Sequence, residues 1–262
     1  NAQEIGEAYI RGSNAYEENE DSKREIDELN TRIYGTVARQ EDGTLSAEGQ
    51  ELLTLWRKGR EISMEEFGRI FKILGSKFDY VFYDSDTTAG GLRVVRDGVV
   101  SGIFKESEGA VIYEGEKKGL HTLVFITSRG NPTYETKDIG LAFLKEERHS
   151  TDHVIIMTGV EQIGHFKVFL AALEDIAPLL AKKTEHVPHG LLQLTTGKMS
   201  SRKGNIITGS SLLADMVTEA QEKNEDPLIA EAVAVGAVKY MILRQAPGGN
   251  PVFDPEKSLS LE

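Results

Sequence analysis

The sequence is organised around one cationic segment, Gly197-Lys198-Met199-Ser200-Ser201-Arg202-Lys203-Gly204-Asn205, which precedes a helical pattern that begins near Ser210. The segment holds three cations, two hydroxyls and two glycines in nine residues, between apolar runs at 191–194 and 206–207. Glycines let a backbone approach a ligand closely, and lysine and arginine meet the charge that builds up on a polyphosphate in a transition state. A solvated basic turn is the alternative. The order Lys-Met-Ser-Ser, basic residues and Gly-Asn favours a phosphate-binding loop at the edge of a sheet.

The composition limits the class of protein. The chain has 262 residues, enough for one large domain or for one domain with an insertion. It has no cysteine, which excludes disulfides, thiolate chemistry and zinc sites with sulfur ligands. No apolar run approaches the roughly 18 residues of a membrane span. Since no signal peptide pattern is present either, we expect cytoplasmic localisation and no membrane partner.

The charge and the chain ends carry two further expectations. The formal net charge of -12 argues against a protein that coats DNA, so any contact with nucleic acid is expected from a local basic patch. The chain starts at Asn1 without methionine and ends at Glu262 without a stop signal. We therefore expect a piece of a longer polypeptide.

The first part of the chain, from residue 1 to about 75, has a helical and acidic pattern. Ser46 is in position to cap one helix. Ser63 and Glu66 fit a capping box that would start another helix, and Gly75 would end it. We interpret the apolar residues of these helices as core packing.

Strand and helix patterns alternate from about 110 to 225, which predicts an α/β layer with a parallel sheet. The clearest unit is Val154–Met157, an apolar run with the profile of a buried parallel strand. It is followed by Thr158-Gly159 and by a helical pattern that extends to about Leu180. Phe78–Tyr83 is predicted to be a short aromatic strand.

Ligands of open α/β sheets bind at the carboxyl ends of strands, where the first polar stretch contains Tyr134 and Asp138. These two residues are four positions apart, so they share one face at the start of a helix. A carboxylate and a phenol together suit a cationic group. The alternative is that Asp138 only places charge at a helix N-terminus while Tyr134 packs.

Two further polar stretches are expected at the same edge. Gly159 would admit a ligand to a helix N-terminus, and Gln162 and His165 share the next helical face. The third stretch contains His186 and His189, three positions apart. No third ligand accompanies this pair, so we expect no metal site.

Together these motifs occur in the order and approximate spacing of arginyl-tRNA synthetases, and the cationic segment resembles the KMSKS loop of class I aminoacyl-tRNA synthetases. The loop has the form KMSSRKGN, with Ser201 in place of the usual second lysine. The resemblance extends from about Phe78 to Glu262, and it is looser over Leu53–Leu74.

The resemblance implies the roles of particular residues. It implies a pocket for the arginine side chain, made by Tyr134, Asp138 and Gln162. It implies an ATP site with the adenine side at His189 and Gly190, and with these residues in all: Gly159, His165, His189, Gly190, Leu191 and Met199. It implies a mobile catalytic loop that stabilises the leaving pyrophosphate: Lys198, Ser200, Ser201, Arg202 and Lys203.

The family activates arginine with Mg-ATP as arginyl-adenylate and transfers it to the terminal ribose of its tRNA. The implied partners are therefore arginine, ATP with Mg²⁺ as co-substrate, and the acceptor end of tRNA-Arg. No tightly bound cofactor is expected, and the full-length protein is expected to be a monomer.

The implied fold is the second half of a Rossmann-type, HUP-like, parallel-sheet nucleotide-binding domain with a mainly helical insertion region on its N-terminal side. The expected domains are a helical insertion region at 1–77, a catalytic portion with the KMSKS-type loop at 78–225, and a helical connection at 226–262 towards an anticodon-binding domain.

One signature of the family is missing from this sequence. No His-x-Gly-His element is present, and in the family it lies on the first strand–helix unit, upstream of the matching segment. We therefore expect that this chain alone cannot aminoacylate tRNA. The alternative is a non-catalytic relative that binds ATP, arginine or tRNA, and an upstream His-x-Gly-His element would favour the enzyme.

Overall fold

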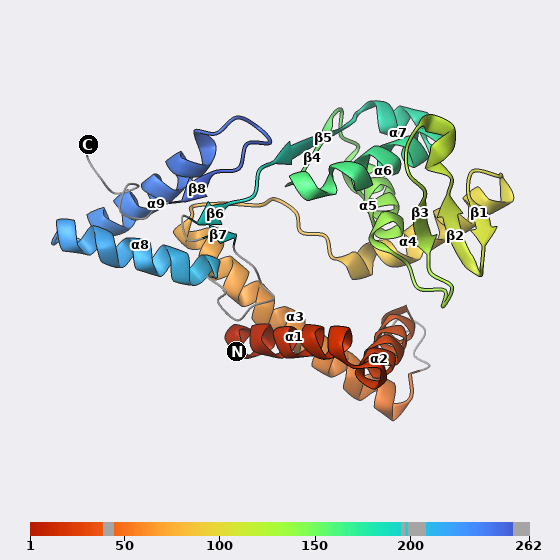
Figure 1. Ribbon diagram of the computed structural model, residues 1–262, viewed down its shortest axis with the longest axis horizontal. Helices are drawn as coiled ribbons and strands as arrows, with labels where there is room; N and C mark the ends of the chain where they lie inside the picture. Colours follow the sequence, from red (N-terminus) through yellow and green to blue (C-terminus); the bar gives the residue numbers. More distant parts are fainter. Residues whose placement is uncertain (39–44, 195–196, 199–207, 254–262) are drawn as a thin grey trace. The chain divides into compact units, whose positions relative to one another are not determined.

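The computed structural model describes residues 1–38, 45–194, 197–198 and 208–253, shown as ribbons in Figure 1. The α-helices are α1 Ala2–Glu18, α2 Glu20–Ala38, α3 Ala47–Ile73, α4 Asp84–Val100, α5 Tyr134–His149, α6 Ile163–Ile176, α7 Pro178–Lys182, α8 Gly209–Lys223 and α9 Pro227–Leu243. Two 3-10 helices are η1 Gly115–Lys118 and η2 Val160–Gln162. The strands are β1 Lys105–Ser107, β2 Ala110–Tyr113, β3 Leu123–Ile126, β4 Val154–Gly159, β5 Thr184–His189, β6 Gln193–Leu194, β7 Gly197–Lys198 and β8 Val252–Phe253.

The chain forms two compact units that interleave in sequence. The first comprises Asn1–Ile26, Thr54–Asp79 and the described part of His189–Glu262, and the second comprises Asp27–Leu53 and Tyr80–Pro188. The domain boundaries expected from the sequence stay a prediction.

The helical start of the chain is confirmed by α1, α2 and α3, and so is one of its two predicted caps. The backbone N–H of Gly49 donates to Ser46 Oγ at 3.1 Å, as expected of an N-cap. The capping box at Ser63 is wrong, because Ser63 lies inside α3 and its hydroxyl donates to the Gly59 carbonyl one turn earlier. Gly75 follows the helix at φ +61°, the left-handed conformation that ends many helices.

The second unit is built on the antiparallel sheet β1-β2-β3. Its core is aromatic, and Phe125 of β3 is fully buried with its ring 4.7 Å from that of Phe104. The short connection through η1 reverses the chain between β2 and β3, and this explains why the pairing is antiparallel. Helices α4, α5 and α6 contribute Val95, Ile139 and Phe169 to the same core.

The aromatic strand predicted at Phe78–Tyr83 is wrong, because these residues take no strand conformation. Phe78 and Tyr80 remain 60% and 61% exposed. The Tyr80 ring lies 3.7 Å from the His149 ring, so the aromatic side chain is used in a ring contact and not on a pleated sheet.

The strand–helix alternation is confirmed by the order β3, α5, β4, α6, α7, β5, in which β4 and β5 form a two-stranded sheet. Strand β4 is apolar on both faces, yet only one face is covered. Ile155 and Met157 are 57% and 66% exposed, so the strand is half-buried. The prediction of a fully buried strand is therefore wrong.

The pair α4 and α5 crosses at very short range through glycines. A Cβ on Gly91 would overlap the backbone carbonyl of Thr136, and a Cβ on Gly140 would overlap that of Thr87. The two sites are reciprocal, each a glycine of one helix facing a threonine of the other. Only glycine permits this approach of two backbones.

The first unit contains the parallel pairing of β6 with β8, and β7 pairs antiparallel to β6. The helices predicted near Ser210 and from Pro227 are confirmed as α8 and α9. Their buried faces pack together and against the end of α3, through Met216, Val238 and Ile70 among others. The fold class is therefore mixed α/β with a parallel sheet, as predicted. In the part of the chain that the structure describes, no helix has the length and apolar character to cross a bilayer.

Candidate active site

The first turn of α5 is fixed at the end of β3. The N–H of Thr133 donates to the Phe125 carbonyl at 3.0 Å, and the hydroxyls of Thr133 and Thr136 donate to the same oxygen. A buried carbonyl at the end of a short strand needs such donors. These three hydrogen bonds hold the start of α5 against the end of β3. The polar residues of α5, from Tyr134 onward, therefore lie directly after the strand.

The centre of the site is an imidazole held between two carboxylates. His165 Nε2 lies 2.7 Å from Asp138 Oδ2, and His165 Nδ1 lies 3.3 Å from Glu135 Oε1. The side chains of His165 and Glu135 are each 14% exposed, and that of Asp138 is 30% exposed. The first turns of α5 and α6 are therefore joined by one charged cluster.

The imidazole of this cluster carries a proton at neutral pH. Although burial acts against the charge, hydrogen bonds to Asp138 and Glu135 raise the pKa of His165 to about 9. The same partnership keeps the pKa of Glu135 below its usual value despite its burial. The site thus consists of two carboxylates that already hold one planar cation, and this arrangement suits a guanidinium group.

The structure brings together residues that the sequence assigned to different ligands. Asp138 was predicted to bind arginine and His165 to line the ATP site, yet the two side chains are hydrogen-bonded. Glu135 was not predicted. Its spacing from Asp138 is i and i+3, which puts two carboxylates on one helical face, and that signal would have found it.

The other two residues of the predicted arginine pocket lie at helix starts. Tyr134 is the first residue of α5 and its side chain is 73% exposed. Gln162 is exposed at the end of η2, where it precedes α6. Tyr134 and Asp138 are one helical turn apart on α5, so they lie on the same face of the helix, as their spacing predicted.

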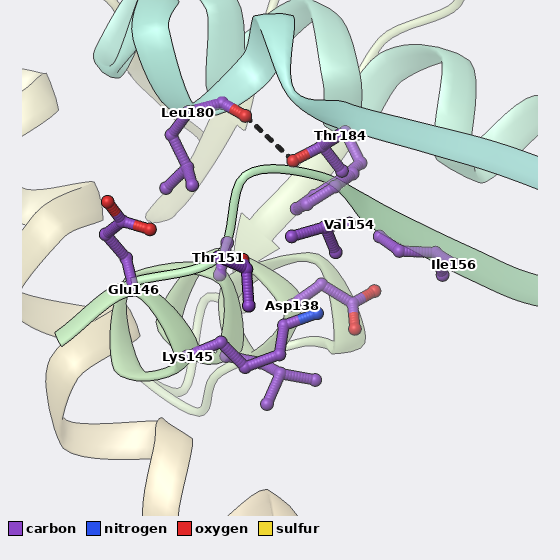
Figure 2. A pocket seen from close by; sticks show the side chains of 11 residues that line it. Asp138, Lys145, Glu146, Thr151, Val154, Ile156, Leu180 and Thr184 are labelled. Carbon is purple, nitrogen blue, oxygen red and sulfur yellow. Dashed lines mark hydrogen bonds between the residues drawn. The ribbon is translucent and has the colours of Figure 1, made fainter. Parts of the chain in front are cut away.

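A small cavity of about 50 Å³ lies beside Asp138 (Figure 2). Figure 2 shows Lys145 near Asp138, with Val154 and Ile156 of β4 and Thr184 of β5 on the other walls. Burial lowers the pKa of Lys145. The volume is well below the roughly 150 Å³ of an engineered cavity that accepts benzene, so this cavity is not itself an arginine pocket.

The histidine pair of the third polar stretch is divided between two environments. His186 Nε2 lies 2.8 Å from Thr158 Oγ1, and its ring stacks on Phe166 with centroids 4.3 Å apart. Burial and the nearby His165 charge lower the pKa of His186. His189 is exposed and its Nδ1 lies 2.9 Å from the Gly190 carbonyl oxygen. His186 therefore acts as a packed, neutral side chain.

The remaining predicted ATP residues are distributed over both units. Gly159 ends β4 and is buried beneath the carboxylate of Glu161. Gly190 meets the backbone of Gly249 so closely that a Cβ would overlap it. The N–H of Leu191 donates to Asn250 Oδ1 at 2.9 Å.

The predicted catalytic loop lies mainly outside the described residues. Lys198 belongs to β7. The other four fall outside the described ranges: Ser200, Ser201, Arg202 and Lys203. Met199, which was assigned to the ATP site, falls outside them as well. Their roles, like those of the other site residues, stay predictions.

The protonated His165 makes a prediction about stability. Its pKa is raised from 6.5 to about 9 in the folded chain, so the stabilisation is complete below pH 6.5 and is lost as the pH rises through 9. We expect the free energy of unfolding to fall by about 3 kcal/mol over this range. Urea unfolding at several pH values measures the fall.

His165→Asn should remove most of this pH dependence. His153→Asn is the matched control, because His153 is an exposed histidine whose Nε2 lies 3.3 Å from Glu185 at the surface. An equal slope of stability against pH in the wild type and in His165→Asn would contradict the assigned cluster.

Comparisons with known proteins agree with the resemblance noted in the sequence. The family model for tRNA synthetases class I (R), catalytic domain, matches residues 3–254. An arginine–tRNA ligase of Parabacteroides distasonis is 29% identical over 279 residues, which cover 97% of this chain and 46% of that protein. An arginine–tRNA ligase of Treponema denticola is 30% identical over 226 residues, which cover 82% of this chain and 38% of that protein.

Solved structures support the same fold. The arginyl-tRNA synthetase of Plasmodium falciparum matches 92% of this chain and 41% of its own, with a TM-score of 0.68 and 19% identity. That of Thermus thermophilus matches 92% of this chain and 48% of its own, with a TM-score of 0.64 and 20% identity. The chain thus spans less than half the length of these relatives.

Proposed function

Because the chain belongs to the family of class I tRNA synthetase (R) catalytic domains, we propose that it serves an arginine–tRNA ligase, in which ATP activates arginine for transfer to tRNA-Arg. The observation that carries the proposal is the cluster of Asp138, Glu135 and His165 on α5 and α6, since Asp138 and Glu135 lie near the start of the helix that begins with Tyr134. Two carboxylates on one helical face match the charge and the planar shape of a guanidinium group.

In this proposal the arginine side chain is recognised by Asp138, Tyr134 and Gln162. Asp138 accepts hydrogen bonds from the guanidinium, and the exposed Tyr134 ring or hydroxyl borders it. The amide oxygen of Gln162 is a further acceptor. His165 then keeps its second partner, Glu135, when Asp138 turns to the substrate.

The proposed ATP site rests mainly on the cationic segment that resembles the KMSKS loop. Its adenine contacts are assigned to His189, Gly190, Leu191 and Met199, with Gly159 and His165 near the helix start. Lys198, Arg202 and Lys203 neutralise the leaving pyrophosphate together with Mg²⁺, and Ser200 and Ser201 offer hydroxyls to it. The charged side chains compensate for Ser201 at the position where a second lysine is usual.

The proposed reaction has two steps. A carboxylate oxygen of arginine attacks the α-phosphorus of ATP in line with the leaving pyrophosphate, and arginyl-adenylate forms. A hydroxyl of the terminal ribose of tRNA then attacks the carbonyl carbon of the adenylate, and AMP leaves. The protein contributes position and charge, and no covalent intermediate with a side chain is needed.

The finer expectations belong to the same proposal. We propose a cytoplasmic protein without a membrane partner that contacts tRNA through a local basic loop, and the net charge of -12 argues against DNA as its partner. We propose a monomer for the full-length protein. Arginine-dependent exchange of pyrophosphate into ATP, measured on the product of the native gene with tRNA present and with lysine as the control amino acid, tests the activity. Binding of arginine or ATP without any exchange would favour a non-catalytic relative.

Lys198→Ala tests the assignment of the loop. Loss of one cation that contacts the leaving group is expected to slow exchange by about a hundredfold, because such contacts act mainly in the transition state. The KM for arginine should change little. Lys223→Ala, at the end of α8, is a control for the loss of a lysine from the same unit. An unchanged exchange rate in Lys198→Ala would show that the loop has only a structural role.

A further inference from the structure

One face of α2 contacts the turn that leads from β3 into α5, the helix that contains Tyr134 and Asp138. Asp27, Thr31 and Tyr34 are spaced i, i+4 and i+7 and lie on this face. Asp27 pairs with Arg129 at 2.7 Å, and the side-chain amide of Asn131 donates to Thr31 Oγ1 at 2.9 Å. Both partners belong to the turn between β3 and α5 (Figure 1).

The third contact of this face is with a buried lysine. Lys137 Nζ donates to the Tyr34 hydroxyl and to Asp84 Oδ2, each at 3.0 Å. The Lys137 side chain is only 10% exposed, so its charge needs these partners. Although burial disfavours the ammonium, the two hydrogen bonds raise the pKa of Lys137. One ammonium group therefore ties together α2, the start of α4 and the start of α5.

The same ammonium group lies over the ring of Tyr134. Its distance from the ring centroid is 4.6 Å, within the range of a cation–π contact. The Tyr34 ring lies at 5.5 Å from the same nitrogen. Tyr134 is 73% exposed, so the contact with Lys137 restrains a ring that is otherwise largely in solvent.

We propose that Lys137, anchored by Tyr34 of α2 and Asp84 of α4, is a positioning residue that orients Tyr134 for the arginine side chain. The inference rests on the proposed function and deepens it, because it assigns α2 a part in substrate recognition. Asp84 balances the lysine charge, so that a second cation can bind near Tyr134 without strong repulsion. A lysine without this carboxylate would repel the substrate.

The test measures the KM for arginine and for ATP in pyrophosphate exchange by the product of the native gene. Lys137→Met keeps the length of the side chain and removes its charge. It should raise the KM for arginine about tenfold through loss of the cation–π contact and of ring order, with the KM for ATP within twofold. Lys137→Arg should restore part of the loss.

Tyr34→Phe removes only the hydroxyl, and it decides the question if Lys137→Met does not fold. It should raise the KM for arginine about threefold through the loss of one hydrogen bond to a charged group. Arg32→Gln is the control, because Arg32 lies on α2 but pairs with Glu48. An unchanged KM for arginine in Tyr34→Phe, or an equal rise for arginine and ATP, would overturn the inference. No exchange by the wild type in the presence of tRNA would instead remove the proposed function.

Discussion

Replacement of Asp138 by asparagine is expected to lower kcat/KM for arginine by about a hundredfold to a thousandfold, because the guanidinium loses its anionic partner in a partly buried site. The change keeps the size of the side chain, so packing is preserved. The carboxylate lies 2.7 Å from His165 and only 30% of its side chain is exposed. The KM for ATP should change by less than a factor of about three, since the carboxylate is assigned to arginine alone.

The control for this variant is Glu147→Gln, which removes a carboxylate from the exposed side of the same helix. Asp138→Asn has a second readout, because His165 loses its closest anionic partner. The pKa of His165, followed by nuclear magnetic resonance, should move down from about 9 towards its ordinary value. Equal losses for arginine and ATP would exclude the assigned role of Asp138.

The sequence predicted the pair of Tyr134 and Asp138 because helical spacing alone decides which side chains share a face. It did not predict that His165 would contact Asp138 and Glu135. That contact depends on how α6 packs against α5, and a tertiary contact leaves no periodic signal in one chain. For the same reason the buried Lys137 was missed, since its partners Tyr34 and Asp84 are 103 and 53 residues away.

Predictions from local sequence patterns were wrong where the same pattern is compatible with more than one structure. Ser63 with Glu66 fits a capping box, but α3 continues through both residues, and the Ser63 hydroxyl donates to the Gly59 carbonyl instead of capping a helix. Phe78–Tyr83 has the aromatic content of a strand, and its rings contact His149 and Phe71 instead. In contrast, the residue order of the KMSSRKGN segment indicated a class I synthetase, although most of the segment lies outside the described residues. Only together with the three polar stretches did it indicate arginyl-tRNA synthetases.

The crossing of α4 and α5 predicts a large effect of a single substitution on stability. Gly91→Ala should lower the free energy of unfolding of the second unit by about 3 kcal/mol, because overpacking forces two helices apart. The added Cβ would overlap the Thr136 carbonyl, a backbone atom that has no alternative rotamer. The Thr136 hydroxyl also donates to the Phe125 carbonyl of β3, so a shift of α5 would disturb the helical turn that contains Tyr134 and Glu135.

Gly90→Ala is the matched control for this variant, one residue earlier on the same helix. Apart from its chain neighbours and the backbone of its own helix, no atom of the described residues lies within 4 Å of a Cβ built there. Alanine has the higher helix propensity, so Gly90→Ala should raise stability by about 0.5 to 1 kcal/mol. Urea unfolding followed by circular dichroism, with hydrogen exchange of the α4 and α5 amides, compares the two. Changes of the same sign and size in the two variants would show that α4 and α5 are not in backbone contact at Gly91. The close packing of α5 against α4 would then not explain how α5 is positioned.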